Sequence, residues 1–269
     1  MSWRPWSNSD FSRQGRSHWN SAAGQVDCLY GAASTDLYER DEKWLFEKAF
    51  GNLENRRLLK LDLWNEGRNT RILLWAASQG AEVHGIDISD NVIRHARETF
   101  RTEGVSARTV MGDVRTLPYA DQTFDCIYTM GTIEHLPDPQ AAVDEIGRVL
   151  KPGGTAVVGT PNKFDPFGRP LVVAVLQALG KYPYAPERSY SFAELENMCE
   201  NAGLETQGRG GVLFMPGALR MLDLWLHLRD SHLGSLTAAA VKPFAKLTGR
   251  LPRLNDYGYL VAVIATRRE

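Results

Sequence analysis

One stretch of the chain, residues 58–89, constrains the fold more than any other. It reads LLKLDLWNEGRNTRILLWAASQGAEVHGIDIS and opens with an apolar run from Leu58 to Leu63. A polar turn at 65–68 follows, and apolar residues then recur at helical spacing, namely Ile72, Leu73, Trp75 and Ala76. A second apolar run ends in Asp87. The pattern therefore predicts a strand, a turn, a helix and a second strand that ends in an acid.

The position of Asp87 points to a ligand. In doubly wound sheets, a ligand lies where the first strand leads into its helix, and a carboxylate about 20 residues further on accepts hydrogen bonds from a ribose diol. Asp87 lies at that spacing from the turn. It could instead cap the helix that follows, a task that Ser89 or Asp90 could serve as well. We favour the ligand role.

Short apolar runs alternate with helical patterns along the rest of the chain. The predicted helices cover residues 36–51, 90–100, 141–150, 171–179 and 192–201, and the further predicted strands cover 109–111, 126–130, 155–160 and 257–266. Ser191 and Glu194 have the spacing of a capping box for the last of these helices. This alternation predicts an α/β fold around a mostly parallel sheet.

Three ordered motifs, GIDIS, MGDV and IEHLPDP, together with this pattern resemble the class I S-adenosylmethionine-dependent methyltransferases of the small-molecule branch. The resemblance covers roughly residues 18–210, and the run 257–266 corresponds to the family's last, antiparallel strand. It implies a doubly wound, mostly parallel seven-stranded sheet of the Rossmann-like methyltransferase fold, with a helical cap. The expected divisions are an N-terminal arm or lid (1–35), the methyltransferase-like domain (36–211), the cap insertion (212–252) and the final core strand (253–269).

The resemblance also implies a cofactor, S-adenosylmethionine, and the residues that bind it. Asp87 would hold the ribose, with Ile88 against the adenine face. Asp113 and the main-chain amide of Val114 would read the adenine amino group and ring nitrogen. The expected cofactor-binding residues are Asp62, Gly67, Asp87, Ile88, Asp113, Val114, Met130 and Gly131. No metal ligand is expected.

The loop after the first strand departs from the family pattern, Asp-x-Gly-x-Gly-x-Gly. After Asp62, the first two glycine positions hold Trp64 and Glu66, and Gly67 alone lies near the third. Glycine suits such a loop because it reaches positive φ and lets the backbone touch the ligand. We expect Trp64 to obstruct that approach unless its ring points away, and Glu66 to repel the methionine carboxylate while attracting the amino group.

A candidate catalytic residue follows the fourth strand. His135, in IEHLPDP, could act as a general base, because the pKa of histidine lies near working pH. The alternative is that Glu134 and His135 belong to a hydrogen-bonded helix start. Methyl transfer from a sulfonium draws its reactivity from the cofactor, so no catalytic triad is expected.

Composition limits the setting and the partners. A net charge of −1 gives no general attraction to nucleic acid. Three cysteines without metal-like spacing favour reduced thiols and a cytoplasmic location. No stretch reaches the roughly 18 apolar residues of a membrane span, and the N-terminus lacks a signal-peptide core. Its tryptophans, Trp3, Trp6 and Trp19, favour an arm or lid that packs on the domain.

The segment 212–252 bears on the acceptor. Its first part is strongly apolar, and Lys242, Lys246, Arg250 and Arg253 then alternate with apolar residues. Such a stretch could lie on an anionic membrane surface as a peripheral contact, although a cap packed on the domain is the commoner arrangement. A cap over the crevice would favour a small, apolar or lipid-like acceptor.

Two other functions fit part of the pattern. A methyltransferase-like protein without methyl-transfer activity could serve as a binding or scaffold subunit, or bind a different ligand, and the altered loop at Trp64 and Glu66 is its support. A nicotinamide-dependent oxidoreductase would share the acid at Asp87 but needs a glycine fingerprint that this chain matches still less well.

Overall fold

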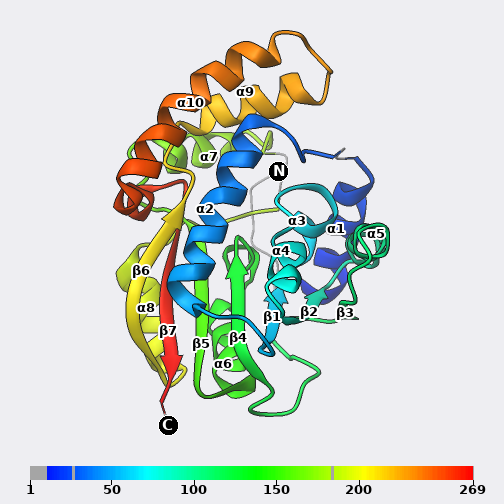
Figure 1. Cartoon of the computed structure of the whole chain (residues 1–269). Coiled ribbons are helices and arrows are strands. Elements are labelled where there is room, and N and C mark those ends of the chain that lie inside the picture. The colour runs from blue at the N-terminus through cyan, green and yellow to red at the C-terminus, as the bar shows by residue number, and fades with distance from the viewer. Residues whose placement is uncertain (1–10, 26–27, 183–184, 269) are drawn as a thin grey trace.

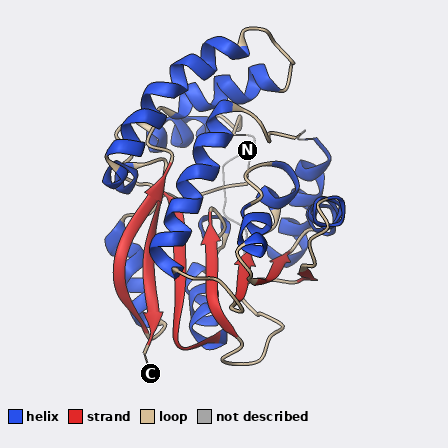
Figure 2. Cartoon of the chain, viewed as in Figure 1, coloured by secondary structure: helices blue, strands red, loops and turns tan. Residues whose placement is uncertain are grey.

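A seven-stranded sheet forms the centre of the molecule (Figures 1 and 2). The computed structural model describes residues 11–25, 28–182 and 185–268, so Trp3 and Trp6 lie outside the described residues. The strands are β1 (Arg57–Leu61), β2 (Glu82–Asp87), β3 (Arg108–Met111), β4 (Phe124–Met130), β5 (Leu150–Pro161), β6 (Leu204–Val212) and β7 (Leu260–Arg267).

The strand order, β3-β2-β1-β4-β5-β7-β6, is that of a doubly wound sheet with one antiparallel strand. Strand β1 pairs in parallel with both β2 and β4, whereas β7 runs antiparallel to β5 and β6. The direction of winding reverses between β1 and β4, and ligands bind at the carboxyl ends of the strands at such a switch point. The predicted fold class is confirmed.

Helices cover both faces of the sheet. Helices α2 (Ala33–Phe50), α4 (Ile72–Ser78) and α5 (Asp90–Thr102) share one buried apolar cluster with Leu58 and Tyr128 of the sheet. Helices α6 (Pro139–Val149) and α8 (Phe192–Asn201) share the second cluster with Ile127 and Val263. The central strands are therefore buried on both sides, as their continuous apolar runs require.

Strand β5 begins five residues before the predicted strand 155–160, and helix α1 (Phe11–Gln25) lies within the expected N-terminal arm. Two further elements differ in kind from the prediction. The expected turn at 65–68 belongs to a short helix, α3 (Trp64–Arg68), which packs closely against α5 at Gly67. Strand β6 is absent from the prediction, since its sequence LETQGRGGV mixes glycine with polar residues. Strand β6 forms because it pairs with β7 along its length, although its own sequence has little β-propensity.

The helix ends follow their capping residues. Ser191 accepts a hydrogen bond from the Glu194 amide while the Glu194 side chain accepts from the Ser191 amide, so the predicted capping box is present. Ser89 caps α5 by accepting from the Val92 amide at 3.2 Å. That bond leaves the capping role to Ser89 and frees Asp87 from it.

Helices α9 (Gly217–His227) and α10 (Gly234–Arg250) lie between β6 and β7 in the chain and form a helical hairpin beyond the end of the sheet (Figure 1). A short 3₁₀ turn, η2 (Pro252–Tyr257), leads back into β7. Helix α7 (Arg169–Ala178) lies below this hairpin, and α1 (Phe11–Gln25) lies beside α5. Among the helices that the structure describes, none is long and apolar enough to span a bilayer.

Candidate active site

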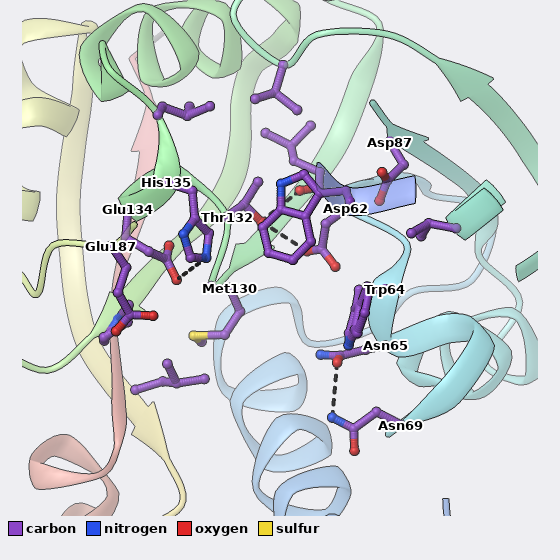
Figure 3. Close-up of a pocket in the computed structure, with 18 of the residues that line it drawn as sticks. Asp62, Trp64, Asn65, Asn69, Asp87, Met130, Thr132, Glu134, His135 and Glu187 are labelled. Atoms are coloured by element: carbon purple, nitrogen blue, oxygen red, sulfur yellow. Dashed lines mark hydrogen bonds and ion pairs between the residues drawn. The ribbon is translucent and has the colours of Figure 1, made fainter. Parts of the chain in front are cut away.

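A cavity opens at the carboxyl ends of β1, β2 and β4, and seven of the eight expected cofactor-binding residues line it (Figure 3). They are Asp62, Asp87, Ile88, Asp113, Val114, Met130 and Gly131. His135 lines the same cavity. The topology therefore brings together residues from four separate strand ends, as the switch-point rule predicts.

Asp87 ends β2 with its carboxylate held by the main chain. Oδ2 accepts from the Leu63 amide at 2.9 Å and Oδ1 accepts from the Ser89 amide at 2.9 Å. Each oxygen retains a free lone pair, which two hydroxyl donors of a ribose could use. Burial raises the pKa of Asp87 to about 7, against the two main-chain bonds that lower it.

Asp113 lies at the cavity wall in a different state. Its Oδ1 accepts from the amide and Nε of Arg115, and its Oδ2 accepts from Arg115 Nη2 and from the Ser12 hydroxyl of α1. These donors, against the effect of burial, hold the pKa of Asp113 below its usual value. Because both oxygens already accept two bonds, an adenine amino group could reach this carboxylate only by displacing Ser12 or Arg115.

The other expected residues supply apolar walls and a turn. Val114 is buried, and Ile88 is half-buried beside it in the cluster that includes Phe11 of α1. Met130 is the last residue of β4, and Gly131 follows with φ +83, a conformation that favours glycine. The sheet thus ends under the cavity in a turn that directs the chain toward His135.

The altered loop is organised by a buried lysine that the sequence reading did not single out. Lys60 of β1 is fully buried, and its Nζ donates to the Asp62 carboxylate at 3.0 Å and lies 3.5 Å from Glu66 Oε1. Although burial alone lowers the pKa of Lys60, the carboxylates of Asp62, Glu66 and Glu42 raise it, so the side chain stays charged. A lysine inside the apolar run LLKLDL was the available signal.

Glu66 does not face the cavity, so the expectation that it meets the methionine end is wrong. Its side chain is buried against Lys60, and Oε2 accepts from the Leu73 amide at 3.0 Å. Gly67 also lies outside the cavity lining. A Cβ atom at that position would come within 2.8 Å of the Cβ atom of His95 on α5, so Gly67 permits the close packing of α3 against α5.

Trp64 lines the cavity together with Asn65 and Asn69 (Figure 3). Its indole meets the indole of Trp19 from α1 edge to face, with ring centroids 5.7 Å apart. Trp19 also contacts the His135 ring at 5.2 Å. Helix α1 is fixed to the domain by Asn20, which accepts from the Ser89 hydroxyl and the Asn91 amide.

His135 lies in the 3₁₀ turn η1 (Ile133–His135) with a defined tautomer. Its Nδ1 lies 3.0 Å from the Pro186 carbonyl oxygen, which can only accept, so Nδ1 carries the proton. Its Nε2 lies 3.8 Å from Glu134 Oε1. Burial lowers the pKa of His135 and raises that of Glu134 well above its usual value, so burial favours the neutral form of each group.

A second polar group adjoins His135. Arg169 pairs with Glu187 at 2.6 Å, both side chains being buried, and the Tyr182 hydroxyl donates to the other Glu187 oxygen at 2.6 Å. Ligand atoms of Glu134, His135 and Glu187 lie within 4.8 Å of one another, a spacing that could hold a metal ion. A cation there would compete with Arg169 for the Glu187 carboxylate. Among the described residues, Nε and Nη1 of Arg169 are buried without a hydrogen-bond partner, and they could donate to an acceptor oxygen.

Comparisons with known proteins find related methyltransferases. Residues 65–158 match a family model described as a methyltransferase domain. A ubiquinone biosynthesis O-methyltransferase of Bordetella avium is 30% identical over 180 residues, 65% of this chain and 72% of that protein. A demethylmenaquinone methyltransferase of Protochlamydia amoebophila is 28% identical over 216 residues, 72% of this chain and 89% of that protein.

A solved S-adenosylmethionine-dependent methyltransferase from Mesorhizobium loti shares the fold, with a TM-score of 0.57 and 17% identity over 89% of this chain and 100% of that one. Two further relatives match this chain over a smaller part of their own sequences, and this chain spans only 28% and 31% of their lengths.

Proposed function

Because the chain belongs to the class I S-adenosylmethionine-dependent methyltransferase family, we propose that it transfers a methyl group from S-adenosylmethionine to a small, lipid-like acceptor. The observation that carries this proposal is the common cavity, which both Asp87 and His135 line. When bound, the cofactor would supply an electrophilic methyl group, and the protein would align it with the acceptor.

The residues present suit the nucleoside part of the cofactor. Asp87 offers two oxygens with free lone pairs for a ribose diol, and Ile88 and Val114 offer apolar contact for a base. Asp62 and Met130 line the cavity where the methionine part would follow. Trp64 shares this wall without sealing the cavity, which supports donor binding despite the altered loop.

Apolar surface near the cap supports a lipid-like acceptor. Met221 and Leu224 of α9 line the cavity, and the neighbouring Leu222 and Trp225 are exposed. Relatives whose names refer to ubiquinone biosynthesis and to demethylmenaquinone agree with an acceptor of this class. The unpaired Arg169 donors would suit an oxygen atom on the acceptor head group.

The direct test is transfer of labelled methyl from S-adenosylmethionine to hydroxylated aromatic compounds with and without an isoprenoid tail. We expect faster turnover with the tailed compounds. Tight binding of S-adenosylmethionine with no transfer to any acceptor would instead favour the alternative, a methyltransferase-like protein that acts by binding. Absence of S-adenosylmethionine binding would contradict methyl transfer and would also favour this alternative, in the form of a scaffold subunit or a protein that binds a different ligand.

We expect His135→Ala to lower turnover by about 100-fold while leaving the affinity for S-adenosylmethionine nearly unchanged, because a positioned base acts in the transition state. Since burial lowers the pKa of His135 from its usual 6.5, turnover should fall only on the acid side of that value. Steady-state kinetics and calorimetry separate the two quantities. His227→Ala, on α9, is the matched control. Equal losses of turnover and affinity would remove His135 from the chemistry.

We also propose that the cap makes peripheral membrane contact through residues 212–252. Exposed apolar side chains of α9, including Leu222 and Trp225, lie on the same hairpin as the exposed Lys242 and Lys246 of α10. Such a combination favours anionic lipid surfaces. We expect co-sedimentation with vesicles of anionic phospholipid at low salt, and weaker binding for Trp225→Ser. Equal recovery in the supernatant with and without vesicles would rule the contact out.

A further inference from the structure

The methionine part of S-adenosylmethionine carries a carboxylate, and the altered loop offers few groups to hold it. Where the family loop would approach the ligand through glycines, this chain has Trp64, and Glu66 turns into the core. A carboxylate inside a cavity needs donors or a cation, since its desolvation is otherwise costly. Donors or a cation from another part of the fold could hold this carboxylate instead.

Arg220 of α9 is a cavity-lining cation from outside the sheet. Arg220 is 8% exposed, and its guanidinium Cζ lies 5.2 Å from the centroid of the Tyr38 ring. Nη1 donates to the Ser34 carbonyl oxygen at 3.3 Å. These contacts fix the guanidinium beside α2 and leave further N–H donors on its other nitrogens.

Arg220 has no carboxylate partner among the described residues. No Asp or Glu oxygen of the described chain lies within 4.0 Å of it, whereas the other cavity arginine, Arg169, has Glu187 at 2.6 Å. Asp223, one turn further along α9, uses its two oxygens to accept from the Ser34 amide and the Thr237 hydroxyl. A buried, unpaired cation is costly, so this position favours an anionic ligand.

The neighbours of Arg220 place it at the methionine end of the cavity. The Tyr38 ring under the guanidinium has its hydroxyl 3.5 Å from Asn65 Nδ2. Asn65 follows Trp64 at the end of β1, where the family's glycine loop would begin. On the premise of the proposed function, we propose that Arg220 binds the methionine carboxylate of the cofactor, replacing the missing loop contacts with a residue of the helical cap.

The experiment compares two ligands that differ in that carboxylate. S-adenosylhomocysteine carries the amino acid part, whereas 5′-deoxy-5′-methylthioadenosine has the nucleoside and thioether without it. Calorimetric titration of Arg220→Gln should show S-adenosylhomocysteine weakened by about tenfold to a hundredfold, the loss of a charged hydrogen bond. Binding of methylthioadenosine should match the wild type, which also shows that the variant is folded.

Two further variants sharpen the result. Arg220→Lys keeps the charge and should retain more affinity for S-adenosylhomocysteine than Arg220→Gln. Arg229→Gln, at an exposed position just after α9, should leave both ligands unaffected. If Arg220→Gln weakened the binding of both ligands equally, or left S-adenosylhomocysteine binding unchanged, the assignment of Arg220 would be wrong. Arg220 would then stabilise the fold or bind an acidic acceptor. Wild-type protein that binds neither ligand would overturn the proposed function as well.

Discussion

Asp87→Ala should weaken S-adenosylmethionine binding by about 100-fold or more. The buried carboxylate has lone pairs left for two ribose hydroxyls, and hydrogen bonds to a charged group contribute about 1.5–3 kcal/mol each. Because burial raises the pKa of Asp87 to about 7, wild-type affinity should also decline as pH falls below 7, when the carboxyl takes up a proton. Calorimetric titration from pH 6 to 8 measures both effects.

The control for this prediction is Asp144→Ala. Asp144 is an exposed acid on α6 that accepts from Gln140 at 2.7 Å and does not line the cavity. The Asp144→Ala variant should bind the cofactor as tightly as the wild type does. Asp87→Asn should lie between, since an amide oxygen can still accept while its NH₂ group cannot. If Asp87→Ala bound as tightly as Asp144→Ala, the ribose would not lie on Asp87.

Lys60→Met should lower the free energy of unfolding by about 3–5 kcal/mol, because it leaves the carboxylates of Asp62, Glu66 and Glu42 without their buried cation. Methionine fills a similar volume, so the loss reports charge more than packing. Denaturant unfolding at pH 8 gives the value. Lys43→Met is the control, because it removes a salt bridge with Glu39 near the surface. It should lower the free energy of unfolding by only about 0–1 kcal/mol.

The pH dependence of that loss has a defined sign. Burial raises the pKa of Glu66 to about 7 from 4.5, so the folded state binds the proton more tightly than the unfolded state and gains stability as pH falls through this range. Removing Lys60 raises the pKa of Glu66 further. The gap between Lys60→Met and wild type should therefore narrow from pH 8 to pH 6. A gap that widens would contradict the charge network.

The strand ends were the part of the site that could be predicted from sequence. Asp87, Asp113 and Met130 each close a short apolar run, and parallel strands bring such ends to one edge. The hydrogen bonds that leave lone pairs free on Asp87 and occupy those of Asp113 were not predictable. They depend on main-chain amides and, for Asp113, on Ser12, which is 101 residues away in the sequence.

Residues whose roles depend on distant partners were also missed. Glu66 turned out to face Lys60 instead of the ligand, since a side chain in a short helix can point to either side and the sequence records no direction. Arg220 lies in the cap, where helical spacing predicts which face of α9 is buried but not which residues or ligands that face contacts. Strand β6 forms because β7 offers an edge to pair with, which its own glycine-rich sequence does not indicate.

A crystal structure with S-adenosylhomocysteine would test the central claim most directly, namely that the switch-point cavity is the cofactor site. We expect the ribose hydroxyls on the Asp87 carboxylate, the base between Ile88 and Val114, and the homocysteine part beside Asp62. A nucleoside bound elsewhere, or the Trp64 indole in the place of the donor, would contradict the account.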